Sequence, residues 1–141
     1  MGKQRTGDDL DLLIGAIRSF EWFWEADGTM PALDVFEGLA SDDQDALVAT
    51  FRHWGDLPHG RRISETRVNE EHDDPKILAA KAGKHRFTVF HAGNDVWIVH
   101  GYYAKRQAKL DKIGRAAVER AIKAKNDYEE RVKRGVYYER T

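Results

Sequence analysis

The 141-residue sequence contains no cysteine. Disulfide bridges and thiolate metal ligands are therefore excluded, which is typical of proteins from a reducing compartment. No hydrophobic run approaches the roughly 18 residues that a membrane span needs, and the first residues lack the apolar core of a signal peptide. We therefore expect a cytoplasmic protein that does not associate with a membrane.

Several motifs of well-known chemistry are also absent. The chain has no GxxxxGK[ST] phosphate loop, no GxGxxG dinucleotide turn and no GxSxG nucleophile elbow. Its six histidines show neither an HxH nor an HExxH spacing. We therefore expect no metal ion, no other cofactor and no hydrolysis through an activated serine or cysteine.

The charged residues are distributed unevenly, although the formal net charge is only −1. Residues 1–75 contain 7 Lys and Arg against 17 Asp and Glu, a balance of −10. Residues 76–141 contain 16 against 7, a balance of +9. Such a long asymmetry is typical of a polarised surface with an anionic partner, and we expect the basic half to hold RNA.

The start of the sequence predicts a mobile segment followed by a strand. Residues 1–16 are largely polar and rich in Gly and Asp, as in a flexible lead-in. Over residues 17–24 the large side chains Phe20, Trp22 and Trp24 recur at every second position. This spacing places them on one face of a strand.

Two helices are expected next. Pro31 suits the first turn of a helix that extends to about residue 39. Ser41, with Gln44 three positions later, has the pattern of a capping box at the start of a second helix. Gly55 is suited to the end of that helix.

The second half predicts three strands and a long helix. The strands are expected at residues 76–81, 86–91 and 96–103, with a Gly-Asn-Asp hairpin turn between the last two. Apolar residues recur every three or four positions over residues 109–133, which indicates a helix. Residues 56–75 have no clear period and are expected to form a connecting loop, with a short strand or helical turn near residues 63–68 as the alternative.

These elements predict an α+β fold with the order β-α-α-β-β-β-α. We expect a small antiparallel sheet packed against an N-terminal helical pair and a C-terminal helix. A single domain would cover residues 17–134, and residues 135–141 would form a C-terminal tail.

Basic residues gather at the start of the predicted central strand. In residues 81–86, Lys-Ala-Gly-Lys-His-Arg, four of the six side chains can carry positive charge. Arg86 on a sheet face beside Lys84 would hold a phosphate, because a guanidinium donates two parallel hydrogen bonds. The alternative is a surface arginine in a routine ion pair.

The following strand adds histidine, tyrosine and further cations to this neighbourhood. Cations for phosphates and rings for splayed bases are what an RNA-binding groove requires. His85 and His100 suit general acid–base catalysis, although a strand histidine is more often simply packed. RNA supplies its own 2′-OH as nucleophile, so such a site can cleave RNA without a metal ion.

Short motifs in this half occur together in one family. They are the Gly-Lys-His-Arg-Phe start of a strand (83–87), the Gly-Asn hairpin (93–94), the Trp-Ile-Val-His-Gly-Tyr strand (97–102) and the basic stretch 105–107 before the last helix. With these motifs the chain resembles the RelE/ParE toxin superfamily, nearest to the HigB and phage-derived HigB-like branch of type II toxin–antitoxin systems. The resemblance covers roughly residues 17–130.

The resemblance implies a metal-independent mRNA endoribonuclease that acts on ribosome-bound mRNA, stops translation and is inhibited by a cognate antitoxin protein. It implies that Arg86 contacts the scissile phosphate and that Lys105 assists. The catalytic candidates are Arg86, His100, Lys105, His85 and Tyr102. The RNA-binding candidates are Lys81, Lys84, Arg106, Lys109 and Tyr103.

Two segments depart from the family pattern, namely residues 105–110 and the acidic stretch 65–74. Two other functions stay open: a non-enzymatic ParE-like gyrase inhibitor, and a phage-encoded RNA-binding or adaptor protein on the same scaffold. A nuclease would arrest translation, whereas a gyrase poison would damage DNA and leave mRNA intact. An adaptor would do neither.

Overall fold

The computed structural model describes residues 2–106 and 111–139. A short 3-10 turn, η1 (Gly7–Asp9), precedes the first strand. The helices are α1 (Pro31–Glu37), α2 (Ser41–Asp56) and α3 (Lys112–Lys133). The strands are β1 (Asp11–Ile14), β2 (Ser19–Trp22), β3 (Val68–His72), β4 (Ile77–Ala82), β5 (His85–Gly93) and β6 (Val96–Ala104).

The expected α+β class is confirmed, but the sheet is larger than the small antiparallel sheet that we expected. It has six strands in the order β1-β2-β6-β5-β4-β3. The β2–β6 pair is parallel and the other pairs are antiparallel, so the sheet is mixed. The two unexpected strands, β1 and β3, are short edge strands. β1 (Asp-Leu-Leu-Ile) and the more polar β3 (Val-Asn-Glu-Glu-His) both lack a clear apolar alternation.

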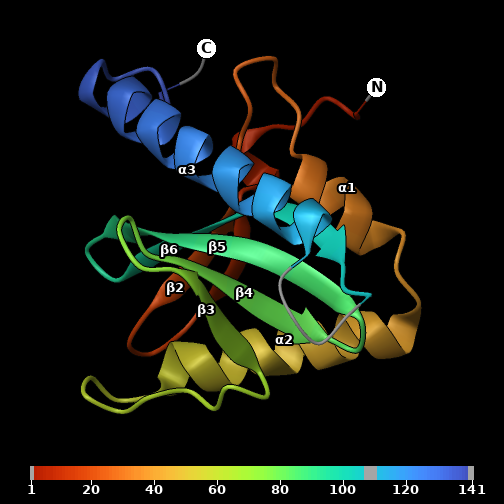
Figure 1. Cartoon of the computed structure of the whole chain (residues 1–141). Coiled ribbons are helices and arrows are strands. Elements are labelled where there is room, and N and C mark those ends of the chain that lie inside the picture. Colours follow the sequence, from red (N-terminus) through yellow and green to blue (C-terminus); the bar gives the residue numbers. More distant parts are fainter. Residues whose placement is uncertain (1, 107–110, 140–141) are drawn as a thin grey trace.

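Helices cover the sheet on both faces (Figure 1). α2 contacts β4, β1 and β2 on one face, whereas α3 contacts β6, β5 and β4 on the other. α1 contacts β6 near α3, so the expected N-terminal helical pair does not pack as one unit on one face. Among the described residues, no helix is both long and apolar enough to cross a membrane.

Contacts tie the first described residues to the fold, within the segment 1–16 for which we expected a mobile lead-in. β1 pairs with β2 at the edge of the sheet. Arg5 is buried, and its guanidinium forms ion pairs with Asp34 and with Glu37 Oε1, the latter at 2.6 Å. A single buried arginine leaves no periodic pattern in the sequence, which explains why this anchor was missed.

The start and end of α2 also differ from the expected signals. Ala40 is the N-cap and makes no side-chain capping bond, while Gln44 Nε2 donates to the Phe36 carbonyl at 2.8 Å. Gln44 therefore links α2 to the end of α1 instead of closing a capping box. Gly55 lies within the last turn of α2. A Cβ at this position would stand 3.1 Å from the Arg18 carbonyl oxygen, so the glycine allows the backbone of α2 to approach the backbone at Arg18 closely.

Tyr137 belongs to the core, within the segment 135–141 for which we expected a C-terminal tail. Tyr137 is 0% exposed, and its hydroxyl accepts a hydrogen bond from the Trp24 N–H at 2.8 Å. Arg131 donates to the Trp24 carbonyl at 2.7 Å, and its guanidinium lies 4.8 Å from the centroid of the Tyr137 ring. The two tyrosines after Gly135 are the sequence feature that could have indicated a segment anchored in the core.

Replacing Tyr137 by Ala should lower the free energy of unfolding by about 3–5 kcal/mol, because it opens a cavity and removes the acceptor of the Trp24 N–H. The matched control is Val136→Ala, since Val136 is 44% exposed and should change stability by less than about 0.5 kcal/mol. Urea denaturation measures both variants. Equal effects would contradict the anchoring role of Tyr137.

Candidate functional site

Cationic side chains meet at the hairpin between β4 and β5. Lys81 and Arg86 are paired directly across these strands. Partial burial and, after it, the charges of Arg86 and Lys105 lower the pKa of Lys81. The Lys105 N–H donates to the Lys84 carbonyl at 2.8 Å. The structure thus brings four of the predicted basic residues to one end of the sheet.

Arg67 extends this cluster beyond the residues predicted from sequence. It lines a shallow pocket of about 550 Å³ together with Lys81, Gly83 and Arg86, under the middle of α2. Lys81 Nζ donates a hydrogen bond to the Glu65 carbonyl at 2.6 Å, which fixes the position of this lysine side chain. We name Arg67, Lys81, Lys84, Arg86 and Lys105 the basic cluster. Arg67 was missed because it precedes an edge strand with no clear sequence pattern.

The guanidinium of Arg86 is oriented by the hairpin itself. Its Nη1 donates to the carbonyls of Gly83 at 2.7 Å and His85 at 3.0 Å. Its Nε is buried without a hydrogen-bond partner, and none of the described residues accepts from Nη2. Nε and Nη2 form the edge with which an arginine holds a phosphate oxygen pair. Because Nε is shielded from solvent, an anion would enter at Nη2.

His85, the residue before Arg86 in β5, is the centre of a hydrogen-bonded chain on the other face of the strand. Its Nδ1 lies 2.7 Å from the Tyr102 hydroxyl, and its Nε2 lies 3.3 Å from Asp43 Oδ2. If Nε2 carries the proton, it donates to Asp43 and Nδ1 accepts from Tyr102. Burial and the charge of Asp43 raise the pKa of Tyr102. The order carboxylate, imidazole, hydroxyl is one that transfers protons in enzymes.

Asp43 joins the chain to the basic cluster. A Cβ added at Gly83 would lie 3.6 Å from Asp43 Oδ1, so this carboxylate lies against the turn whose carbonyl orients Arg86. The sequence did not reveal this role, because an acidic residue in the first turn of a helix is normally explained by the helix dipole. Only the fold brings the start of α2 to the hairpin.

The structure places His100 in a different pocket, toward α3. Its Nε2 is 3.9 Å from Glu25 Oε1, and its Nδ1 has no hydrogen-bond partner among the described residues. Burial, followed by the charge of Arg120, lowers the pKa of His100 to about 4. His100 is therefore neutral at physiological pH, and it does not line the pocket that contains Arg86.

The remaining predicted RNA-binding residues differ in their surroundings. Tyr103 is 3% exposed and donates its hydroxyl proton to Glu71 at 2.5 Å, so its ring offers no open face for a base. Arg106 is exposed beyond the end of β6. Lys109 lies outside the described residues. In residues 2–106 and 111–139, no three His, Asp or Glu side chains converge in a way that could hold a metal ion.

Comparisons of the sequence with models of protein families and with curated proteins found no match. The interpretation of the site consequently depends on its geometry. That geometry is an oriented arginine, a group of lysines and a proton-transfer chain at one hairpin.

His100 should make stability depend on pH. Its pKa is about 4 in the folded protein, against about 6.5 in the unfolded chain, so the unfolded chain binds more protons between these values. Stability should therefore fall as the pH drops from about 6.5 to 4, by on the order of 3 kcal/mol. Urea denaturation at several pH values should show a smaller fall for His100→Gln. Identical pH dependence in both proteins would refute this expectation.

Proposed function

We propose that the protein is the toxin of a type II toxin–antitoxin pair, a RelE/HigB-type endoribonuclease that cleaves ribosome-bound mRNA in the cytoplasm. The observation that carries the proposal is that Asp43 of the chain Asp43–His85–Tyr102 lies against the β4–β5 hairpin, which also holds the basic cluster. Cations to hold a polyanion and groups to move protons are the two requirements of RNA cleavage through the 2′-OH.

In this proposal Arg86 binds the scissile phosphate. Gly83 and His85 hold its Nη1, so the guanidinium is oriented before RNA arrives. Such preorganisation is worth more than the same charge on a mobile side chain, because no reorganisation is needed when negative charge develops. The lysines of the basic cluster would hold the neighbouring phosphates.

The proton transfers follow from the order of the chain. The 2′-OH gives its proton to the Tyr102 oxygen while Tyr102 passes its own proton to His85 Nδ1, and Asp43 stabilises the resulting imidazolium. The 2′-oxygen forms a bond to phosphorus and the bond to the 5′-oxygen breaks, which leaves a cyclic 2′,3′-phosphate. The 5′-oxygen takes a proton from Lys81, whose pKa is lowered by burial and neighbouring cations. Exchange with water restores both groups.

The same surface would be the point of control. A cognate antitoxin that covers the basic cluster with acidic side chains would block the phosphate site and be attracted to it over a distance. Such a partner would also compensate the mutual repulsion of these cations.

Replacing Arg86 by Ala should lower mRNA cleavage by about 10²–10³-fold, the usual effect of removing one preorganised donor. Cleavage is measured by in-vitro translation followed by primer extension on the mRNA. Arg134→Ala is the matched control, since Arg134 is exposed and its ion pair among the described residues is with Glu130 of the same helix. Intact mRNA with the unaltered protein would overturn the nuclease proposal, and DNA damage instead would indicate a gyrase inhibitor.

Tyr102→Phe should keep the ring contact with Phe87 but remove the hydroxyl of the chain. We expect kcat for cleavage of a short RNA to fall by about 10²–10⁴-fold with little change in KM, as for the loss of a general base. Tyr138→Phe removes a tyrosine hydroxyl bonded to Glu21 and Tyr128 and serves as the control. A Tyr102→Phe variant with full kcat would show that another group accepts the proton.

A further inference from the structure

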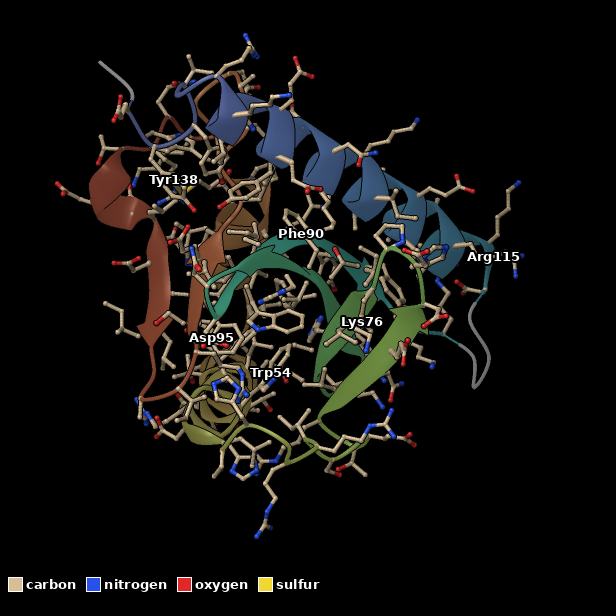
Figure 2. All side chains as sticks on the ribbon, turned by 90° about the vertical axis from the view of Figure 1, so that its left-hand side faces the viewer. Trp54, Lys76, Phe90, Asp95, Arg115 and Tyr138 are labelled. Atoms are coloured by element: carbon tan, nitrogen blue, oxygen red, sulfur yellow. The ribbon has the colours of Figure 1, made fainter. Side chains whose placement is uncertain are left out.

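A second pocket lies on the α2 side of the sheet, between the end of α2, β4 and the segment before β3. Its volume is about 450 Å³, within the usual range of small-ligand sites. Figure 2 shows two of its lining residues, Trp54 below the curved teal strands and Lys76 beside them at the green strands. Its aromatic and cationic lining consists of Trp54, Trp97, Arg18, Arg61, Arg62 and Lys76. We name it the tryptophan pocket.

Two indole rings form the aromatic wall. The ring centroids of Trp54 and Trp97 are 5.1 Å apart, and the His91 ring lies 4.7 Å from Trp97. Trp54 is 4% exposed and belongs to the core, whereas Trp97 is only partly buried. Trp97 therefore presents ring surface to the pocket, and it is held in place by its two aromatic neighbours.

The cations of this pocket exceed its carboxylates. Glu65 and Glu70 also line it, so four positive side chains face two negative ones. Arg18 Nη1 is committed to the carbonyls of Trp54 and Leu57 at the end of α2. By contrast, the described residues offer no hydrogen bond or ion pair to the side chains of Arg61, Arg62 and Lys76.

We propose that the tryptophan pocket binds a nucleotide, with the base stacked on Trp97 and the phosphate held by Arg62 and Lys76. Every nucleobase has a flat face that stacks on an indole, and cations that lack partners favour an anion beside it. A simple anion would leave the indole unused, and an uncharged aromatic ligand would leave the cations unpaired. A nucleotide is the ligand that uses both walls.

The nucleotide can be free or part of an RNA strand. Leu78 lines the tryptophan pocket and Lys81 lines the pocket of Arg86. These residues are three positions apart on β4, roughly 10 Å. An RNA strand bound at Arg86 would pass the tryptophan pocket, which would then read a base beside the cleavage site. Assigning the nucleotide to an RNA strand rests on the proposed nuclease function, whereas binding of a free nucleotide does not.

Tryptophan fluorescence of the purified protein is the test, because a base stacked on Trp97 quenches its emission. The probes are a nucleoside 5′-monophosphate, the nucleoside, inorganic phosphate and a short single-stranded RNA. We expect the monophosphate to bind about tenfold or more tightly than the nucleoside or phosphate, and to weaken as salt rises. Equal binding of all three small probes, or none, would overturn the proposal.

Substitutions of the pocket cations test whether the monophosphate binds in the tryptophan pocket. The double variant Arg62→Ala, Lys76→Ala should lose about tenfold or more in monophosphate affinity, the loss expected for charge-assisted hydrogen bonds. Arg52→Ala removes an exposed cation of α2 outside this pocket and should bind as the unaltered protein does. An equal loss in the Arg52 variant, or none in the double variant, would show that the nucleotide binds elsewhere.

The RNA probe separates the two sources and the two proposals. Tighter binding of RNA than of monophosphate, with a shifted cleavage pattern in the double variant, would assign the pocket to the RNA strand. Tighter binding of the monophosphate would assign it to a free nucleotide. Nucleotide binding is measured without cleavage. If the protein binds the monophosphate but leaves mRNA intact, the nucleotide-pocket proposal stands and only the nuclease proposal is refuted.

Discussion

The parallel pairing of β2 with β6 is the interaction on which the other parts of the site depend. It joins a strand near the start of the chain to one near the end, with Ser19 beside Val96 and Trp22 beside Val99. Of the two helices that follow β2, α1 contacts β6, whereas α2 contacts β4, β1 and β2. For this reason the start of α2 reaches the β4–β5 hairpin, and Asp43 meets His85 there.

The same closure brings the acidic half of the chain against the basic half. Several carboxylates contact the basic half directly: Asp43 with His85, Glu25 with His100 and Glu71 with Tyr103. The cations at the hairpin were left out of this pairing. Arg86 and Lys84 form no ion pair with a carboxylate among the described residues, although a third of the sequence is charged. A positive region that persists beside abundant carboxylates favours an external anion as its partner.

Sequence reasoning recovered the elements that have a strong period and missed contacts made by single residues. The last three strands, the 92–95 hairpin and the long helix follow from alternation, turn residues and 3.6-residue spacing. The basic cluster was predictable in part because its lysines lie close together in the sequence. Asp43 and Arg67 were not, since each joins the site through tertiary contacts alone. His100 was proposed as a catalyst from its strand position, but its burial under α3 depends on which face of β6 that helix covers.

Among the described residues, the β4–β5 hairpin contains one buried donor without a hydrogen-bond partner, Arg86 Nε. A buried polar atom without a hydrogen bond costs about 1–3 kcal/mol, and native proteins remove most such atoms. Arg86 Nε is one of only a few in the described chain, and it lies beside lysines that repel one another. A fold selected only for stability would replace Arg86 by an apolar or neutral residue. The retained charge is explained if an external anion, such as a phosphate, binds at Nη2 and neutralises it.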